Sequence, residues 1–213
     1  MASLTVLGKV LLATLLAAAA AAVQLPPLPQ ALQQTPPPAA EQFLDLWHRS
    51  MVEQQRINFT MDNQEAPKTI ISPSNHVVTN FAPQDVPSPL YSLQGRFVEL
   101  KTKLVRDYLV ADLVEPEDKN LLNPDGFAVR NLNNKTIVFE KNATGTVTIN
   151  DFPVVNMISV EDAQIYVIDG ALFDHMEQVA EGSRALFDEH SAFDAPMPQD
   201  ERRFGPKNST ENI

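Results

Sequence analysis

Four short apolar runs stand in the segment from Lys135 to Leu172, and they are the clearest pattern in the chain. The runs are rich in Val, Ile, Thr, Phe and Tyr, which suit a pleated, half-buried surface, and they cover 136–140, 146–150, 154–158 and 165–168. Between them lie Asn-Ala-Thr-Gly, Asn-Asp and Glu-Asp, residues that accept the backbone conformations of tight turns. The pattern predicts an antiparallel meander.

Helical spacing of apolar residues predicts two longer helices before the meander. At 41–57 one face carries Phe43, Leu44, Trp47 and Met51, and we expect Trp47, the single tryptophan, to anchor the core. At 96–110 a wide apolar stripe contains Phe97, Leu100, Leu104, Val105, Tyr108 and Leu109. Shorter elements are expected as a strand at 68–71, a helix capped by Ser74, a strand at 127–130 and a helix at 174–186.

The two ends of the chain differ from the middle. Residues 1–22 read as a signal peptide, with an apolar segment and the small-residue pattern Ala20-Ala21-Ala22, although an uncleaved membrane anchor is the alternative. Six prolines at 23–40 predict an extended linker. One folded domain is then expected at 41–175, followed by an acidic, mostly disordered tail at 176–213. We therefore predict a secreted or extracellular protein, with signal anchoring at a membrane as the alternative.

The charge and the cysteine content exclude several classes of function. The formal net charge is −11 and the isoelectric point is about 4.7, which argues against nucleic acid as a partner because phosphate binding requires an excess of Lys and Arg. The chain has no cysteine, which excludes disulfides, thiolate metal sites and cysteine nucleophiles. We predict no metal and no cofactor.

Three segments together resemble a fasciclin (FAS1) domain, as a divergent single-domain member. They are KTIISPSNHVV at 68–78, LVRDYLV at 104–110, and TVTINDFPVV followed by IYVIDGAL within 146–172. Thr69, Pro73, Ser74 and Asn75 match the first family segment, and the last is matched by Ile165, Val167, Ile168, Asp169 and Leu172. The resemblance spans about 41–175. It implies an α+β wedge, a twisted β-sandwich of short strands with helices packed on one side.

The same resemblance implies a non-enzymatic binding module in cell adhesion or in association with an extracellular matrix or cell wall. Its Tyr-His pair falls on Asp107-Tyr108 and its later His on Tyr166, so these three residues are the candidate interaction positions. The Asp-Ile dipeptide that some members offer to integrins is absent near Ile158-Ser159, and no Arg-Gly-Asp occurs. The expected partner is an extracellular protein, a polysaccharide or a second copy, with no transmembrane segment after signal cleavage.

Four Asn-x-Ser/Thr motifs follow the leader, at Asn58, Asn134, Asn142 and Asn208. Behind a signal peptide such motifs accept N-linked glycan wherever they are exposed. Asn142 falls at a predicted hairpin tip, which makes it the strongest of the four. We expect at least two of them to carry glycan.

No catalytic constellation is evident, and two other functions stay open beside the binding module. One is a carrier for a small apolar ligand held between the helix at 97–109 and the meander, which needs a cavity of several hundred Å³. The other is a small hydrolase that uses Asp169 as a general base, although no partner for that carboxylate is visible in the sequence. A strand-end aspartate that bonds the backbone is the simpler interpretation of Asp169.

Overall fold

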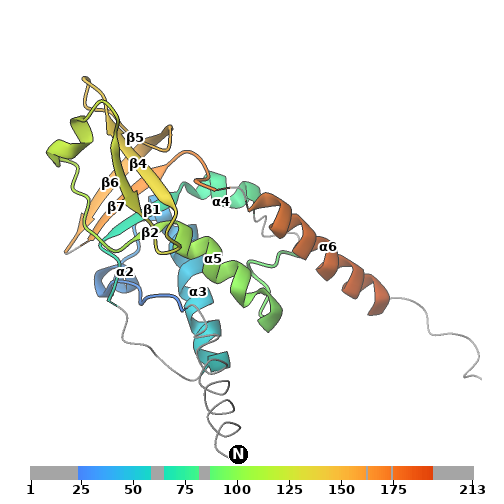
Figure 1. The fold of residues 1–213 in the computed structure, drawn as a ribbon. Coiled ribbons are helices and arrows are strands. Elements are labelled where there is room, and N and C mark those ends of the chain that lie inside the picture. Colours follow the sequence, from blue (N-terminus) through green and yellow to red (C-terminus); the bar gives the residue numbers. More distant parts are fainter. Residues whose placement is uncertain (1–23, 59–64, 82–86, 162, 174, 194–213) are drawn as a thin grey trace, which may run out of the picture.

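The structure, a computed structural model, describes residues 24–58, 65–81, 87–161, 163–173 and 175–193 (Figure 1). In these residues a mixed α+β fold is built on a seven-stranded sheet that nearly closes on itself, in the order β2-β1-β7-β6-β5-β4-β3. The strands are β1 (Thr69–Pro73), β2 (Leu109–Val110), β3 (Phe127–Arg130), β4 (Thr136–Lys141), β5 (Val147–Ile149), β6 (Phe152–Val160) and β7 (Ala163–Ile168).

The helices of the described residues lie before, between and after these strands. They are α2 (Gln30–Gln34), α3 (Glu41–Asn58), α4 (Asn75–Phe81), α5 (Val98–Asp107) and α6 (Met176–Phe193), with 3-10 turns η1 (Pro38–Ala40), η2 (Gly95–Phe97) and η3 (Lys119–Leu122). Among them none combines the length and the apolar character that crossing a membrane requires.

The predicted meander is confirmed, because β4, β5, β6 and β7 pair in sequence order and antiparallel. The turn residues act as expected. Asn150 and Asp151 have φ of 45° and 66° in the two-residue turn between Ile149 and Phe152, and Gly145 has φ of 85° in the turn before β5. Positive φ at both central residues gives a turn whose twist matches that of the flanking strands.

Strands β2 and β1 continue the sheet beyond β7 and bring it close to closure. β1 runs parallel to β7, in register from Thr69 opposite Gln164 to Pro73 opposite Ile168, and β2 pairs antiparallel with β1. A bridge between Val110 and Asn131 then joins the β2 edge to the chain that follows β3. Every residue of β1 and β7 is buried, as expected for strands covered on both faces.

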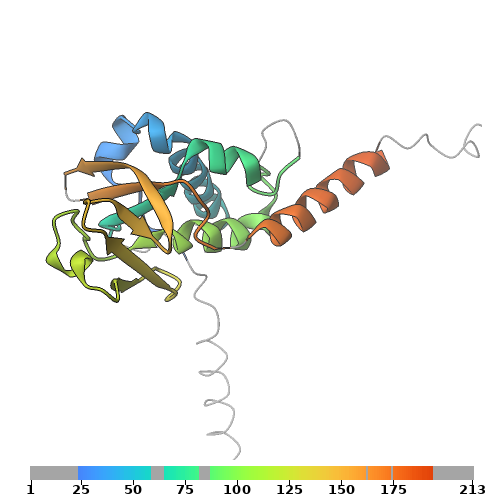
Figure 2. The same ribbon diagram turned by 90° about the horizontal axis from the view of Figure 1, so that it is seen from above.

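The helices cover the sheet at β1. α3 packs against α5, α4 and β1, and Trp47 is completely buried, as predicted. Ser74 caps α4 as expected, its hydroxyl accepting from the backbone N–H of Val77 at 3.4 Å. Between α3 and α5 a buried ion pair joins Glu53 to Lys101. α6 extends away from the sheet beside the N-terminal part of α5 (Figures 1 and 2).

The linker prediction for 23–40 is wrong for the residues that the structure describes, 24–40. Their leucines pack on α3, and Leu32 is only 1% exposed. Two hydrogen bonds tie the segment to α3: the backbone N–H of Leu25 donates to Gln54 Oε1 at 2.8 Å, and Trp47 Nε1 donates to the carbonyl of Pro26 at 3.1 Å. Prolines lack an N–H but keep their carbonyls, so a proline-rich chain can still be tied to a helix by acceptor groups.

Two other boundaries differ from the expectation. Residues 176–193, expected within a mostly disordered tail, form α6, while 1–22 and 194–213 lie outside the described residues. The helix expected at 96–110 ends at Asp107, because Leu109 and Val110 leave it to pair with β1. Leu109 fits the helical stripe as well as it fits a strand, so periodicity alone does not separate these outcomes.

Candidate functional site

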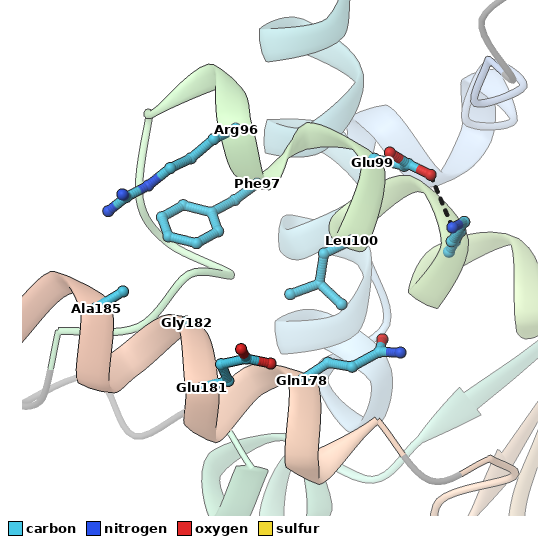
Figure 3. Close-up of a pocket in the computed structure, with 9 residues that line it drawn as sticks. Arg96, Phe97, Glu99, Leu100, Gln178, Glu181, Gly182 and Ala185 are labelled. Atoms are coloured by element: carbon cyan, nitrogen blue, oxygen red, sulfur yellow. Dashed lines mark ion pairs between the residues drawn. The ribbon is translucent and has the colours of Figure 1, made fainter.

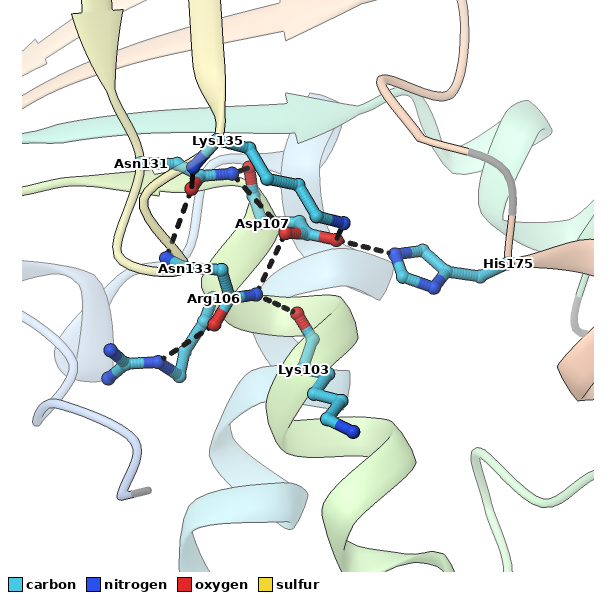
Figure 4. Close-up of polar contacts among 7 residues, drawn as sticks. All are labelled: Lys103, Arg106, Asp107, Asn131, Asn133, Lys135 and His175. Atoms are coloured by element: carbon cyan, nitrogen blue, oxygen red, sulfur yellow. Dashed lines mark hydrogen bonds and ion pairs between the residues drawn. The ribbon is translucent and has the colours of Figure 1, made fainter.

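A cluster of polar side chains surrounds Asp107, the last residue of α5 (Figure 4). Asp107 has no exposed surface. Its Oδ2 accepts from Lys135 Nζ at 2.7 Å and lies 2.7 Å from His175 Nε2, which donates when it carries the ring proton. Its Oδ1 accepts from the side-chain amides of Asn133 at 2.8 Å and Asn131 at 3.3 Å. Four donors from two distant parts of the chain thus meet on one carboxylate.

The donors keep this buried carboxylate ionised. Burial by itself acts to raise the pKa of Asp107, but the hydrogen bonds from His175, Lys135 and Asn133 and the charge of Lys135 together hold it below its ordinary value. A buried carboxylate with four donors has little capacity to take a proton from a substrate. The cluster instead joins the end of α5, the turn before β4 and the chain that enters α6.

The turn between β3 and β4 is shaped by the same residues. Asn131 Oδ1 accepts from the backbone N–H groups of Asn133 and Lys135 at 3.0 and 2.8 Å, and Asn134 takes a positive φ of 61° between them. Arg106, next to Asp107 on α5, donates from Nη1 to the carbonyl of Gln24 at 2.8 Å and from Nη2 to the carbonyl of Leu132. This arginine therefore ties the N-terminal segment to the turn.

A small cavity lies beside the ring of His175. It has a volume of about 20 Å³ and is lined by Phe81, Leu104, Tyr108, Ala171, Phe173, His175, Met176 and Val179. Such a volume is near that of a single water molecule. Nδ1 of His175 is buried and has no hydrogen-bond partner within the described part of the chain. The space under α5 is far smaller than a carrier of apolar ligands requires.

An open groove of about 440 Å³ separates the start of α5 from α6 (Figure 3). One wall carries Arg96, Phe97, Glu99, Leu100 and Lys103, and the other carries Gln178, Glu181, Gly182 and Ala185. Glu99 and Lys103 pair with each other at 2.7 Å, and both are exposed. Arg96 pairs with Glu189 of α6 at 2.7 Å. Because the charged groups on the first wall are all paired, they do not converge on a position where a ligand group would sit.

All three candidate interaction positions are buried. Tyr108 packs its ring against Phe43 with centroids 5.3 Å apart, and Tyr166 packs against Phe139 at the same separation. The Tyr166 hydroxyl donates to the carbonyl of Val114 at 2.8 Å. Burial raises the pKa of both tyrosines. Their burial, like that of Asp107, contradicts a role for these residues in direct contact with a partner, because no surface of them is offered.

Asp169 lies at the end of β7 and is exposed. The hydroxyl of Ser74 donates to its Oδ1 at 3.5 Å, and its own backbone N–H donates to the carbonyl of Pro153 at 3.2 Å. No backbone N–H among the described residues is recorded as donating to the carboxylate of Asp169. The predicted bond of this carboxylate to the backbone is therefore not found, and its recorded partner is the hydroxyl of Ser74. An exposed carboxylate lacks the desolvation that tunes a general base. The described residues also contain no group of three or more acidic, His or Cys side chains arranged for a metal ion.

Two of the four predicted glycosylation sites lie on exposed turns. Asn142 begins the turn between β4 and β5, where its Oδ1 accepts from the hydroxyl of Thr144 at 2.6 Å. Asn134 lies in the turn between β3 and β4. The side chain of Asn58 and the whole of Asn208 lie outside the described residues.

The cluster at Asp107 was missed as a unit by reasoning from the sequence. Asp107 entered only through the family resemblance, and His175 and Lys135 were not connected with it. One signal was present: Asp107 follows Leu100 and Leu104 on the apolar stripe of its helix, where a charged residue needs partners. The identity of those partners depends on the tertiary fold.

Comparisons with known proteins give no family for this chain. No protein-family model matches it, and no curated protein matches it. The resemblance to fasciclin domains therefore rests on the residues quoted above.

Proposed function

We propose that this protein is a secreted or cell-surface FAS1-like binding module without enzymatic activity, acting in cell adhesion or in association with an extracellular matrix or cell wall. The observation that carries the proposal is the arrangement of the three segments on which the resemblance rests. They are distant in sequence, and their strands β2, β1 and β7 are neighbours at one end of the sheet.

The pairing of these segments is direct. β1, from the first segment, lies in parallel register with β7, from the last, and the backbone N–H of Ser74 continues the contact by donating to the carbonyl of Ile168 at 2.9 Å. β2, which ends the middle segment, pairs with the other side of β1. Segments that match one family's pattern are expected to pack together in one core. The pairing of β2 with β1 and of β1 with β7 supports the resemblance in this way. The helices on β1 are consistent with the helical side of a wedge.

Exposed acceptor sites support an extracellular location. Asn134 lies in the turn before β4 and Asn142 in the turn after it, and each is followed two residues later by Thr. Glycan at these turns would extend into solvent without disturbing the core. With the leader at 1–22, these sites favour passage through the secretory pathway.

The partner is expected to bind elsewhere than at the family's Tyr-His positions. In this chain those positions are Asp107 and Tyr108, which serve the core. The two alternative functions are not favoured by the geometry, because the cavity under α5 is about 20 Å³ and Asp169 is exposed. An exposed surface remains the place where a binding module would meet its partner.

Compartment is tested first, by expressing the full chain in secreting eukaryotic cells. We expect protein in the medium whose mass falls on treatment with an N-glycosidase, and a stepwise smaller fall in the variants Asn134→Gln and Asn142→Gln. The double variant lacks both acceptor asparagines. Its polypeptide mass can be measured both in the medium and in the cells, so loss of glycan is distinguished from loss of export. Protein that stays in the cytosol with an intact leader and an unmodified mass would overturn the proposal.

Binding is tested next with the secreted protein. Beads coated with it are expected to adhere to immobilised matrix proteins or polysaccharides, or to aggregate with one another. Beads coated with heat-unfolded protein are the control for nonspecific attachment. Secretion without any of these interactions would confirm the compartment and contradict the adhesive role.

A further inference from the structure

β6 has a free edge along most of its length. β5 pairs only with its first two residues, Phe152 and Pro153, whereas β7 pairs with it from Val154 to Val160. A register irregularity between Val154 and Asn156 separates these two parts. Beyond it, β6 continues beside β7 with no strand recorded on its other side among the described residues (Figure 2).

The backbone groups on this edge can be assigned from the hydrogen bonds of β7. The N–H of Gln164 donates to the carbonyl of Lys68 at 2.8 Å, so the backbone of Gln164 faces β1. Opposite residues in an antiparallel pair bond each other only at alternate positions. Ser159, which lies opposite Gln164, and Met157, which lies opposite Tyr166, therefore direct their N–H and C=O groups away from β7.

The side chains of this edge offer none of the usual protection. Edge strands are normally guarded by charged residues, especially Lys, or by proline at the exposed positions. From Val154 to Val160 the sequence is VVNMISV, with no charged residue and no proline. Val155 is 57% exposed and Met157 is 45% exposed. An irregularity at the start of the free edge is the one guarding feature, and from Asn156 to Val160 the register with β7 has no further shift.

We propose that β6 pairs with β6 of a second copy of this chain, antiparallel and about a two-fold axis at Met157. This arrangement brings Met157 next to its own counterpart and Val155 opposite Ser159 of the second copy. Each exposed apolar side chain is then covered by the other copy, and the outward N–H and C=O groups bond each other.

Charge favours this location for a contact between two copies. Two copies each carrying −11 repel wherever acidic surfaces meet, and β6 is a stretch with no charge at all. At the proposed register Glu161 comes opposite Pro153 of the second copy, so no acidic residue of this strand faces its own counterpart. Because the interface has no ion pair of its own and the copies repel, added salt is expected to strengthen the dimer.

This inference rests on the strand geometry and not on the proposed function. It extends that function where both hold, because a two-fold pair presents two binding surfaces at once and raises avidity. The two ideas fail separately: secretion and glycan mass test the compartment, whereas mass in solution tests the strand pairing.

The test is the mass of the purified full chain by light scattering over a concentration series, at low and high salt. We expect a reversible dimer that salt strengthens. In the proposed dimer, Met157→Lys places two positive charges side by side. The dissociation constant should rise at least about tenfold, even though the substitution makes the net charge of each copy less negative. Leu93→Lys is the matched control, because Leu93 is also apolar and is 72% exposed, on a segment outside the sheet.

Two further variants address the backbone and the register. Ser159→Pro removes one outward N–H and should weaken the dimer, while Ser159→Ala removes only the hydroxyl and should not. Since the chain has no cysteine, Met157→Cys adds a single thiol, and mild oxidation should link two copies through it, because facing residues lie within disulfide reach. Leu93→Cys should stay unlinked.

A wild-type chain that is monomeric at its highest soluble concentration would overturn the inference. So would a dimer that survives Met157→Lys unchanged or that Leu93→Lys disrupts equally, since either places the interface elsewhere. Circular dichroism of each variant identifies any that fail to fold. Met157→Cys shortens a side chain that is 45% exposed and adds no charge, so its oxidation still decides the question if the lysine and proline variants do not fold.

Discussion

Oδ2 of Asp107 lies 2.7 Å from Nε2 of His175, although the two residues are 68 positions apart in the chain. Asp107 ends α5, and His175 immediately precedes α6. The same carboxylate oxygen also receives Lys135 from the start of β4. One buried charge therefore holds together a helix, the chain entering a strand and the entry to a second helix, which accounts for its complete burial.

Replacing Asp107 by Asn is expected to destabilise the fold. The variant keeps the shape but removes the negative charge, so Lys135 and His175 lose their common acceptor. Loss of a buried charge-assisted pair costs about 3–5 kcal/mol, and the partial exposure of Lys135 reduces this to about 2–3 kcal/mol here. Urea unfolding followed by circular dichroism measures the change.

Asp169→Asn is the matched control, since it makes the same chemical change at an exposed aspartate. Its effect on the free energy of unfolding should stay within about 0.5 kcal/mol. Equal stability of the two variants would contradict the structural role of the Asp107 cluster.

The contribution of Asp107 should depend on pH in acid. Its pKa is lowered in the folded protein from an ordinary value of 3.8, so the unfolded chain binds a proton more readily than the folded chain does. The stabilisation is therefore fully present above about pH 4 and is lost as the pH falls through the lower, folded value. The difference in unfolding free energy between wild type and Asp107→Asn should shrink accordingly. A difference that stays constant throughout this acid range would show that the charge of Asp107 is not responsible.

The packing of the proline-rich segment can be tested at Leu32. Leu32→Ala removes a side chain that is 1% exposed and should cost about 2–4 kcal/mol of stability. Gln34→Ala, an exposed neighbour at the end of α2, should be nearly neutral. If residues 24–40 were a free linker, both variants would unfold at the same urea concentration as the wild type.

The buried pair between Glu53 and Lys101 predicts a strongly non-additive double variant. Lys101→Met leaves Glu53 buried without its cation and should cost about 3–5 kcal/mol. Glu53→Leu combined with Lys101→Met replaces the pair by apolar side chains and should recover most of that loss. A double-mutant cycle in urea measures the coupling, and additive losses would contradict the pairing.

Gly182 permits the close approach of α6 to the loop before η2. A Cβ at this position would lie 2.8 Å from two atoms of the Pro89 ring and 3.2 Å from Phe97. Alanine ordinarily favours a helix by about 1 kcal/mol over glycine, but the rigid proline ring cannot yield, so Gly182→Ala should loosen α6. Hydrogen exchange of the α6 amides should become faster. The exposed neighbour Glu181→Ala is the control, and faster exchange in it alone would contradict the steric argument.

Local chemistry made much of the sheet predictable. Asn150 and Asp151 accept positive φ and so mark a hairpin, and the β-branched runs on either side suit strands. Ser74 signalled the start of α4 in the same way. These elements were recognisable because the residues that specify them are neighbours in the sequence.

The remaining features depend on contacts that sequence neighbours do not reveal. Pro26 holds the N-terminal segment through a carbonyl that accepts from Trp47, and no local pattern indicates that bond. Leu109 continues a helical stripe yet pairs with Ile70, because β1 needs a neighbour on that side. No local pattern connects His175 with Asp107, and only the fold brings the two together.

The parallel pairing of β1 with β7 has a consequence for biosynthesis. Contacts across this pair span about 95 positions, as between Ser74 and Asp169, so an emerging polypeptide cannot close its sheet until nearly all of the domain has left the ribosome. Long-range pairing of this kind slows folding, because the entropy of closing a large loop is lost before the contacts form. Until then the apolar residues of β1 lack the cover of β7, and exposed apolar surface of this kind makes a nascent chain prone to aggregation.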